Sequence, residues 1–272
     1  MDHIAEPDCE SRKRFFCSWH ACVAGFEDVL ARLRSGVVPE DDTHHLINVS
    51  SGKYVYRCQD GGYDFAYKSQ DGKAFWRYLF RASLPLRECR NYLILKKLNI
   101  PIPQVLASGD TRTCFILRES FLITSFLNGT ADGRIFMPQG KFREGYDALR
   151  HAYCEKNLIL MARLHDAGYF HKASHPRNFL FRGDTPENME IFWIDVARLR
   201  KAKNLRRAIV VDLHTFFRDM KLQQQEVMEL LELYVNTAQN HVFSSADGIM
   251  KELINFKRRA FSHHKYKLFA DA

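Results

Sequence analysis

The sequence predicts an α+β fold in two lobes, a small antiparallel β lobe followed by a larger, mostly helical lobe. Between Leu46 and Lys68, short apolar and aromatic runs alternate with turn signals. Among these signals, Asp60-Gly-Gly favours a tight hairpin, because glycine adopts positive φ at little cost. Beyond Asn128, apolar residues recur at spacings of three and four, which is typical of amphipathic helices.

Composition limits the class of protein but does not identify its function. The chain has 272 residues, 40 basic against 32 acidic side chains, and a formal net charge of +8, which favours an anionic partner such as a nucleotide, a nucleic acid or a phospholipid surface. No long apolar run or signal peptide is recognisable, so a cytoplasmic location is expected. Seven cysteines without Cys-x-x-Cys pairing indicate reduced thiols rather than a disulfide framework or a zinc site.

Residues 1–45 are expected to form a helical extension ahead of the β lobe. The segment from Arg12 to Arg34 places its apolar residues mostly at helical spacing, namely Phe15, Phe16, Trp19, Val23, Phe26, Leu30 and Leu33. A helix that lies on anionic lipid needs a basic stripe along its length, whereas the basic residues here lie at the two ends. Packing of this helix on the domain is therefore favoured over contact with a membrane.

The β lobe is predicted to span residues 46–128. Three antiparallel strands are expected between Leu46 and Lys68, followed by a helix that begins near Pro85. The Ile-Pro-Ile-Pro sequence at 100–103 breaks this helix. Strand patterns return at 105–109, 113–118 and 121–127.

The helical lobe is predicted to span residues 129–272. Helices are expected at 142–150, 153–166, 209–217, 223–239 and 248–256. The segment 257–269 interleaves basic residues with aromatic ones, so it could contact RNA, lipid headgroups or substrate phosphates, although such tails are more commonly solvated.

The segment from Leu164 to Asp195 carries the most informative pattern. It has the pattern of a helix end, a polar loop, an apolar strand, a hairpin turn and a second strand that ends in a carboxylate. Phosphoryl-transfer sites are built in this way, and protein kinases carry His-Arg-Asp-Leu-x-x-x-Asn on the loop. His171 matches the histidine, Asn178 the asparagine and Asp195 the metal-binding aspartate. Ala173 stands where that pattern has the catalytic-base aspartate.

The similarity to kinases also implies a site for ATP and Mg²⁺ between the lobes. Lys68, in a Phe-Ala-Tyr-Lys context, resembles the lysine that contacts the α- and β-phosphates of ATP, and Glu88 is its candidate partner. Asn178 and Asp195 would hold Mg²⁺, which prefers oxygen ligands. Taken alone, Lys68 reads as an exposed lysine at a strand end and Glu88 as an acid that favours the helix dipole.

Two further segments complete the predicted nucleotide site. Gly52, in Ser50-Ser51-Gly52, stands where a glycine-rich loop would be, so backbone amides there are expected to hold phosphates loosely. The last strand of the β lobe is expected to lead into a hinge, and its position in the chain assigns adenine contacts to the backbone of Thr124, Ser125, Phe126 and Leu127.

As an ordered set, these residues resemble the bacterial lipopolysaccharide kinases, the family of Kdo and heptose kinases and their InaA-like relatives, over residues 46 to 220. Arg87-Glu88, the Ile-Pro-Ile-Pro sequence and the Arg206-Arg-Ala-Ile-Val-Val-Asp212 segment are similar to this family in particular. The resemblance implies phosphorylation of a sugar hydroxyl of the lipopolysaccharide core, on Kdo or heptose, or of a similar small glycan or glycolipid. It also implies action at the cytosolic face of the inner membrane, and a buried Asp212 that braces the loop.

The length of the segment after Asp195 bears on the acceptor. Sixteen residues separate Asp195 from Asp212, which is too short for a protein-kinase activation loop with its peptide-docking segment. A small molecule or a lipid-linked sugar is therefore the expected acceptor, rather than a folded protein.

Ala173 leaves two functions open. General-base assistance contributes about 10²–10⁴-fold, so loss of the aspartate is compatible with a slow kinase, in which His175 could take over its role. An engineered Asp-to-Ala change would also account for Ala173. The alternative is a pseudokinase that binds nucleotide and scaffolds or regulates a membrane-biosynthesis partner. Nucleic-acid binding is disfavoured, because charge explains none of the ordered motifs.

Overall fold

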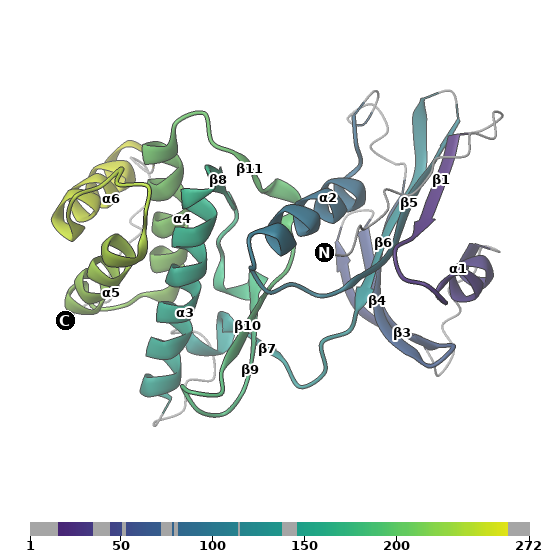
Figure 1. Cartoon of the computed structure of the whole chain (residues 1–272), viewed down its shortest axis with the longest axis horizontal. Coiled ribbons are helices and arrows are strands. Elements are labelled where there is room, and N and C mark those ends of the chain that lie inside the picture. The colour runs from purple at the N-terminus through teal and green to yellow at the C-terminus, as the bar shows by residue number, and fades with distance from the viewer. Residues whose placement is uncertain are drawn as a thin grey trace. The chain divides into compact units, whose positions relative to one another are not determined.

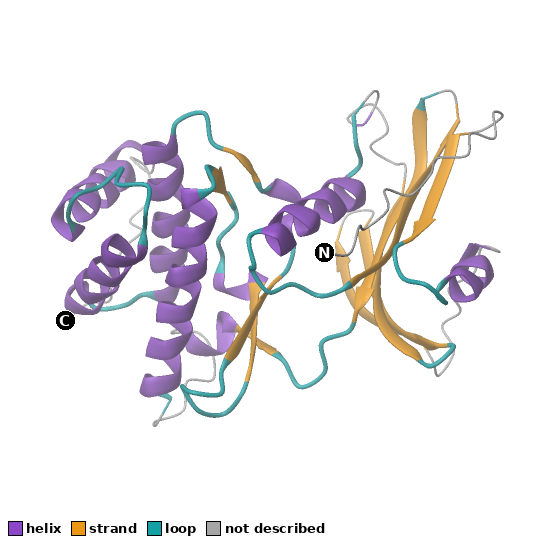
Figure 2. Ribbon diagram, in the orientation of Figure 1, coloured by secondary structure: helices purple, strands orange, loops and turns teal. Residues whose placement is uncertain are grey.

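The structure is a computed structural model, and it describes residues 16–34, 44–50, 53–71, 78, 81–113, 115–137 and 146–260. These residues divide into two compact units (Figures 1 and 2). The first unit ends at Arg90 and resumes over Pro103–Leu127, and the second comprises Asn91–Ile102 and the chain from Asn128 onward.

The first unit is built on an antiparallel sheet in the order β1-β5-β6-β4-β3-β2. Its strands are β1 (Phe16–Ala21), β2 (His44–Ser50), β3 (Lys53–Asp60), β4 (Tyr63–Asp71), β5 (Val105–Thr113) and β6 (Ile116–Ser125). The three strands expected between Leu46 and Lys68 are confirmed as β2, β3 and β4. Gly61 and Gly62 have φ of 58° and 80°, so the hairpin between β3 and β4 uses the backbone freedom that the sequence indicated.

The prediction of one helix from Arg12 to Arg34 is wrong. Phe16–Ala21 forms β1, which pairs with β5 at an edge of the sheet, and only Glu27–Arg34 forms a helix, α1. Pairing with a distant strand overrides the local helical spacing, and Gly25, with φ of 84°, turns the chain between the two elements. β1 therefore belongs to the β sheet rather than to a helical extension. Residues 1–15 lie outside the described part of the chain.

The core of the first unit lies between α1 and the sheet. Phe26 and Val29 are buried against Phe65, Phe121 and other apolar side chains. The ring of Phe26 meets the ring of Phe65 edge-on at 5.5 Å between centroids, an arrangement that aromatic pairs favour.

The second half of the sheet contains two strands where the sequence suggested three. The expected strand at 113–118 is divided, because β5 continues to Thr113 and β6 begins at Ile116. Phe115 has φ of 68° and an exposed side chain, so it occupies the turn of this hairpin rather than a strand.

Helix α2 (Leu84–Lys97) carries the boundary between the units, which falls after Arg90. Ser83 caps its start, because the Ser83 hydroxyl accepts a hydrogen bond from the Leu86 amide at 3.3 Å. Its end carries Lys96 and Lys97, which suit the helix dipole, and Asn99 leaves the helical conformation with φ of 52°. The predicted helix beginning near Pro85 is thus confirmed.

The second unit is mostly helical, with α3 (Asp147–Asp166), α4 (Leu205–Met220), α5 (Gln224–Thr237) and α6 (Ala246–Ala260) packed together (Figure 1). The helices expected at 209–217, 223–239 and 248–256 are confirmed. Those expected at 142–150 and 153–166 are one continuous helix, α3, in the described residues. Residues 138–145 and 261–272, with most of the predicted tail, lie outside the described part of the chain.

Short strands attach the functional segment to these helices. The strands β9 (Phe179–Arg182) and β10 (Glu190–Trp193) form the predicted hairpin, which β7 (Ala131–Asp132) extends. A second pair consists of β8 (Tyr169–Phe170) and β11 (Arg200–Lys201). Aromatic side chains fill the interior, where the rings of Phe179 and Trp193 lie 5.0 Å apart. The loop from His171 to Asn178 is therefore held between β8 and β9.

Candidate active site

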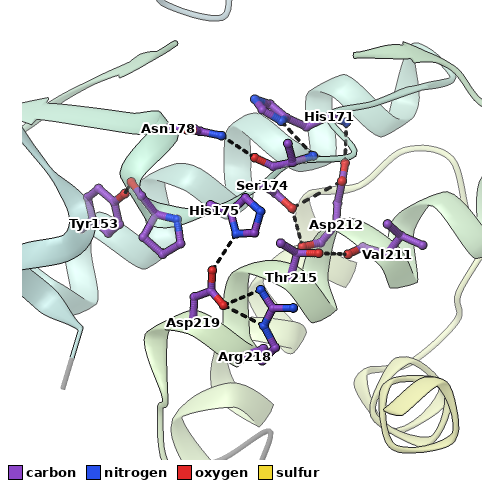
Figure 3. A network of polar contacts seen from close by, with 12 residues as sticks. Tyr153, His171, Ser174, His175, Asn178, Val211, Asp212, Thr215, Arg218 and Asp219 are labelled. Atoms are coloured by element: carbon purple, nitrogen blue, oxygen red, sulfur yellow. Dashed lines mark hydrogen bonds and ion pairs between the residues drawn. The ribbon is translucent and has the colours of Figure 1, made fainter. Parts of the chain in front are cut away.

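The loop that follows β8 is organised around the carboxylate of Asp212 on α4 (Figure 3). Its Oδ2 accepts a hydrogen bond from the His171 amide at 2.6 Å, and its Oδ1 accepts one from the Lys172 amide at 2.7 Å. The Asp212 side chain has no exposed surface. A buried carboxylate is costly without partners, and these two amides supply them. The bracing role that the family resemblance implied for Asp212 is confirmed.

This brace holds the backbone in a conformation that it would not adopt freely. Lys172 has φ of 63°, in the left-handed region that is unfavourable for a residue with a Cβ. Such conformations cost roughly 1–3 kcal/mol and persist where the surroundings fix them. The hydroxyl of Ser174 adds a further tie, because it donates to the Asp212 carbonyl oxygen at 2.7 Å.

Asp212 is supported in turn by a buried histidine and tyrosine. Nε2 of His165 on α3 lies 3.3 Å from Asp212 Oδ2, and Nδ1 of the same ring lies 2.8 Å from the Tyr234 hydroxyl. Burial raises the pKa of Tyr234 well above its usual value, and Asp166 and Asp212 add to this rise. The hydrogen bond with Asn240 acts in the opposite direction but does not outweigh burial. Tyr234 thus stays protonated, and three helices meet through this hydrogen-bonded chain.

Ala173 occupies the centre of the loop. Its amide donates to Nδ1 of His171 at 3.3 Å, and its carbonyl accepts from the side-chain amide of Asn178 at 2.8 Å. Only 6% of its surface is exposed. The loop therefore keeps an ordered, hydrogen-bonded form although its side chain at this position is a methyl group.

Asn178 and Asp195 are brought together by the β9–β10 hairpin. The amide of Ile194, next to Asp195, donates to the Asn178 carbonyl at 2.9 Å. Asp195 itself is exposed and has φ of 52°, and it begins the short 3-10 helix η4 (Val196–Arg198). Aspartate tolerates this left-handed conformation better than most residues. The two residues predicted to hold Mg²⁺ are therefore neighbours within one unit.

The donor set suits a magnesium ion with phosphate ligands. Mg²⁺ usually keeps several waters and takes one or two protein oxygens in addition to substrate phosphates. Because the Asn178 nitrogen is engaged with Ala173, the oxygen of that amide is left as its ligand atom. The second candidate ligand, Asp195, is an exposed residue. No group of three or more His, Cys, Asp or Glu suited to a metal occurs among the described residues, so this part of the chain offers no all-protein cage.

Asn91 on α2 anchors the turn that follows Asp195. Its side-chain nitrogen donates to the carbonyl oxygens of Val196 at 2.7 Å and Leu199 at 3.1 Å. Asn91 is buried, and Val196 is fully buried. These bonds fix η4 and with it the backbone next to Asp195.

His175 forms a dyad with Asp219 of α4. Its Nδ1 lies 2.7 Å from Asp219 Oδ2, and Arg218 binds the other oxygen of the same carboxylate at 2.7 Å (Figure 3). Burial alone would raise the pKa of Asp219, but the hydrogen bonds from His175 and Arg218 outweigh it and hold the pKa below its usual value. An ionised carboxylate only accepts hydrogen bonds, so Nδ1 of His175 carries the proton, and Nε2 is the acceptor of the neutral ring.

In the first unit, the predicted pair of Lys68 and Glu88 is present. Nζ of Lys68 on β4 lies 2.6 Å from Oε1 of Glu88 on α2, with side-chain exposures of 22% and 7%. A nearly buried carboxylate requires such a partner, so the simpler explanation of Glu88 as a first-turn helix acid does not account for its burial. The pair fixes the ammonium group of Lys68, which lies within β4, three residues before the last residue of the strand.

The predicted adenine segment is largely occupied by the sheet itself. The Ser125 amide donates to the Gln104 carbonyl at 2.8 Å, and the Phe126 amide donates to the Asp64 carbonyl at 3.0 Å. Thr124 is a buried residue of β6, and Leu127 follows it in the loop. The amides of Ser125 and Phe126 are therefore engaged in this structure and are not open donors. Gly52 lies outside the described residues.

Sequence reasoning missed two residues that shape the site, Asn91 and Asp219. A signal for Asp219 was present, because it lies seven residues after Asp212 and two helical turns place both carboxylates on one face of α4. Asn91 had no such signal, since its partners lie more than a hundred residues away in the sequence.

Comparisons with known proteins give a family and a fold. The model of the "Lipopolysaccharide kinase (Kdo/WaaP) family" matches residues 69–234. The solved structure of WaaP in complex with acyl carrier protein has a TM-score of 0.59 at 16% identity, covering 79% of this chain and 87% of that one. The PknI kinase domain of Mycobacterium tuberculosis has a TM-score of 0.46 at 13% identity, covering 81% and 98%. No curated protein sequence matches the chain. The predicted kinase-like α+β fold is confirmed.

We expect Asp212→Ala to lower the free energy of unfolding by about 3 kcal/mol, because it leaves the His171 and Lys172 amides without their acceptor. Urea denaturation measures this change. Glu232→Ala, at an exposed position on α5, is the control and should change the stability by less than about 0.5 kcal/mol. Equal effects of the two substitutions would contradict the bracing role.

We expect Asn91→Ala to destabilise the protein by about 1–2 kcal/mol, since two carbonyls lose a buried donor. Hydrogen exchange at the amides of residues 196–199 should also accelerate. Arg90→Ala, at the exposed neighbouring position, should leave exchange there unchanged. Unchanged exchange in the Asn91 variant would show that other contacts fix η4.

Proposed function

We propose that this chain, which belongs to the lipopolysaccharide kinase (Kdo/WaaP) family, transfers a phosphoryl group from ATP to a sugar hydroxyl. The acceptor would be Kdo or heptose of the lipopolysaccharide core, or a similar small glycan or glycolipid. The observation that carries this proposal is the braced loop, in which Asp212 fixes the backbone while Asn178 and Asp195 lie side by side through the Ile194 hydrogen bond.

Each residue of the site has a role in this proposal. Lys68, held by Glu88, would bind the nucleotide phosphates, and Asn178 and Asp195 would bind Mg²⁺. When bound, the metal neutralises charge on the phosphates. Phosphoryl transfer depends mostly on positioning and on charge neutralisation, so a rigid loop and a fixed lysine are the main contributions that the protein has to make.

We assign the proton of the acceptor hydroxyl to His175. Its Nε2 is the acceptor of the neutral ring, and Asp219 both orients the ring and stabilises the imidazolium that forms. This pairing supports the kinase over the pseudokinase, because it supplies a base on the loop where Ala173 has none.

The acceptor class follows from the segment between Asp195 and Asp212. This segment holds only η4, β11 and the start of α4, and it exposes six basic residues, namely Arg198, Arg200, Lys201, Lys203, Arg206 and Arg207. Of these, Arg206 forms an ion pair with Glu252. Cations in the first turn of α4 oppose its dipole, so an anionic ligand would relieve a local charge excess. An acidic sugar or a phosphorylated glycolipid meets this requirement.

The proposed location is cytoplasmic, with peripheral contact at the inner membrane where such acceptors are made. None of the helices in the described residues is long and apolar enough to cross a membrane. The net charge of +8 supports contact with an anionic surface.

A pseudokinase that scaffolds a membrane-biosynthesis partner is the second candidate, and Ala173 is the observation that favours it.

Nucleotide binding is tested by thermal shift with Mg·ATP at millimolar concentration. We expect a rise in Tm with the native chain, because a ligand that binds only the folded state stabilises it. Lys68→Ala and Asp195→Ala should each abolish the shift. Lys97→Ala, at an exposed position on α2, is the matched control and should retain it. A native chain without any shift would remove the basis for both candidate functions.

The proton acceptor is tested by transfer of labelled phosphate from ATP to lipopolysaccharide-core acceptors. If His175 takes the proton, His175→Ala should lower the rate by about 10²–10⁴-fold. Ala173→Asp should then change it little. His151→Ala, a partly exposed histidine on α3, should leave the rate unchanged.

The opposite result identifies a different enzyme. A rate that is unaffected by His175→Ala but rises with Ala173→Asp would show that no base operates in the native chain. Nucleotide binding without transfer in all three proteins would establish the pseudokinase.

A further inference from the structure

The hydroxyl of Tyr153 on α3 bridges two carbonyl oxygens that flank Asn178 in the chain. It donates to the carbonyl of Pro176 at 2.9 Å and to that of Phe179 at 3.0 Å (Figure 3). Burial is the main cause that raises the pKa of Tyr153 well above its usual value. The phenol therefore keeps its proton and remains a donor to both carbonyls.

The ring of Tyr153 is held independently of its hydroxyl. It has no exposed surface and packs against the rings of Phe136 and Phe181, whose centroids lie 5.1 and 5.7 Å away. Gly133 begins the 3-10 helix η2 (Gly133–Phe136), and a Cβ at this position would lie 2.1 Å from the Tyr153 hydroxyl oxygen. Glycine thus leaves the room that this hydroxyl needs beside its acceptors.

Asn157, one turn after Tyr153 on the same face of α3, holds the strand that leads to Asp195. Its Oδ1 accepts a hydrogen bond from the Trp193 indole at 3.2 Å, two residues before Asp195. Its Nδ2 donates to the Tyr153 carbonyl at 2.8 Å, which leaves the oxygen to face the indole, a group that only donates. Asn157 and Trp193 have no exposed surface. One face of α3 therefore contacts the chain next to each predicted metal ligand.

We propose that Tyr153 and Asn157 are positioning residues that together set the separation of Asn178 and Asp195, the two residues that would hold Mg²⁺. The role toward the metal rests on the proposed function, whereas the four hydrogen bonds of these side chains do not. Mg²⁺ demands near-ideal octahedral geometry, so a displaced ligand binds it less tightly. Groups that orient metal ligands without touching the metal typically contribute about 10–100-fold to metal affinity.

The role toward the metal is tested on the full-length chain by calorimetric titration with ATP, once with Mg²⁺ and once with EDTA. The ratio of the Kd without Mg²⁺ to the Kd with Mg²⁺ is the metal gain. Tyr153→Phe keeps the ring and removes the hydroxyl, so it should lower the metal gain by about tenfold and leave the Kd without Mg²⁺ unchanged. Asn157→Ala should lower the gain in the same way. Cys154→Ala truncates a fully buried side chain at the next position of α3, and this control should keep the native gain.

The positioning itself is measured without any ligand, by hydrogen exchange at the amides of Asn178 and Phe179. These amides donate to the carbonyls of His175 and Pro176. Tyr153→Phe should accelerate their exchange by about tenfold relative to the amides of α5, because the loop loses a buried donor. A uniform loss of stability would instead accelerate exchange in both segments alike.

The two measurements separate failure of this proposal from failure of the proposed function. Unchanged exchange at the two amides in Tyr153→Phe would overturn the positioning role, and so would a native metal gain that Tyr153→Phe leaves intact. An equal loss of the gain in Cys154→Ala would show that α3 acts through packing, which also overturns it. A native chain without any metal gain would contradict the proposed Mg²⁺ site, while the exchange experiment would still decide whether the hydroxyl positions the loop.

Discussion

The described loop depends on one buried carboxylate. Asp212 offers two oxygens to the successive amides of His171 and Lys172, and Lys172 has a left-handed conformation where the chain is held by this carboxylate. The hydrogen bonds are charge-assisted and shielded from water, so each is stronger than an exposed one. The free energy needed to bury the charge and to strain the backbone is offset by these bonds and by the packing of α3, α4 and α5 around His165 and Tyr234.

Local patterns predicted those elements whose partners are near in sequence. The hairpins β3–β4 and β9–β10 were recognisable because turn residues and strand residues stand next to each other. Lys68 and Glu88 were recognisable because the order of motifs, rather than either residue alone, indicated their pairing. The role of Asp212 came from the family resemblance and not from its own surroundings in the sequence.

The failures share a physical cause, which is that the deciding contact is distant. The local spacing of residues 16–21 predicts a helix, because their strand partner, β5, lies about ninety residues further on and does not affect that spacing. Asn91 was overlooked for the same reason. The hydrogen bonds of the Ser125 and Phe126 amides likewise depend on distant segments, and only the structure reveals them. Adenine contact by the backbone of residues 124–127 stays a prediction.

The turn after Asp195 has a consequence for control of the protein. A molecular switch requires two packings of similar free energy, and many kinases have such a pair at the segment that carries the metal-binding aspartate. Here Val196 is fully buried, and two carbonyls of the turn are tied to Asn91, so one arrangement is strongly favoured over any other. A second packing of this turn would have to break both hydrogen bonds and expose the Val196 side chain, so a conformational switch at this point would be costly in free energy.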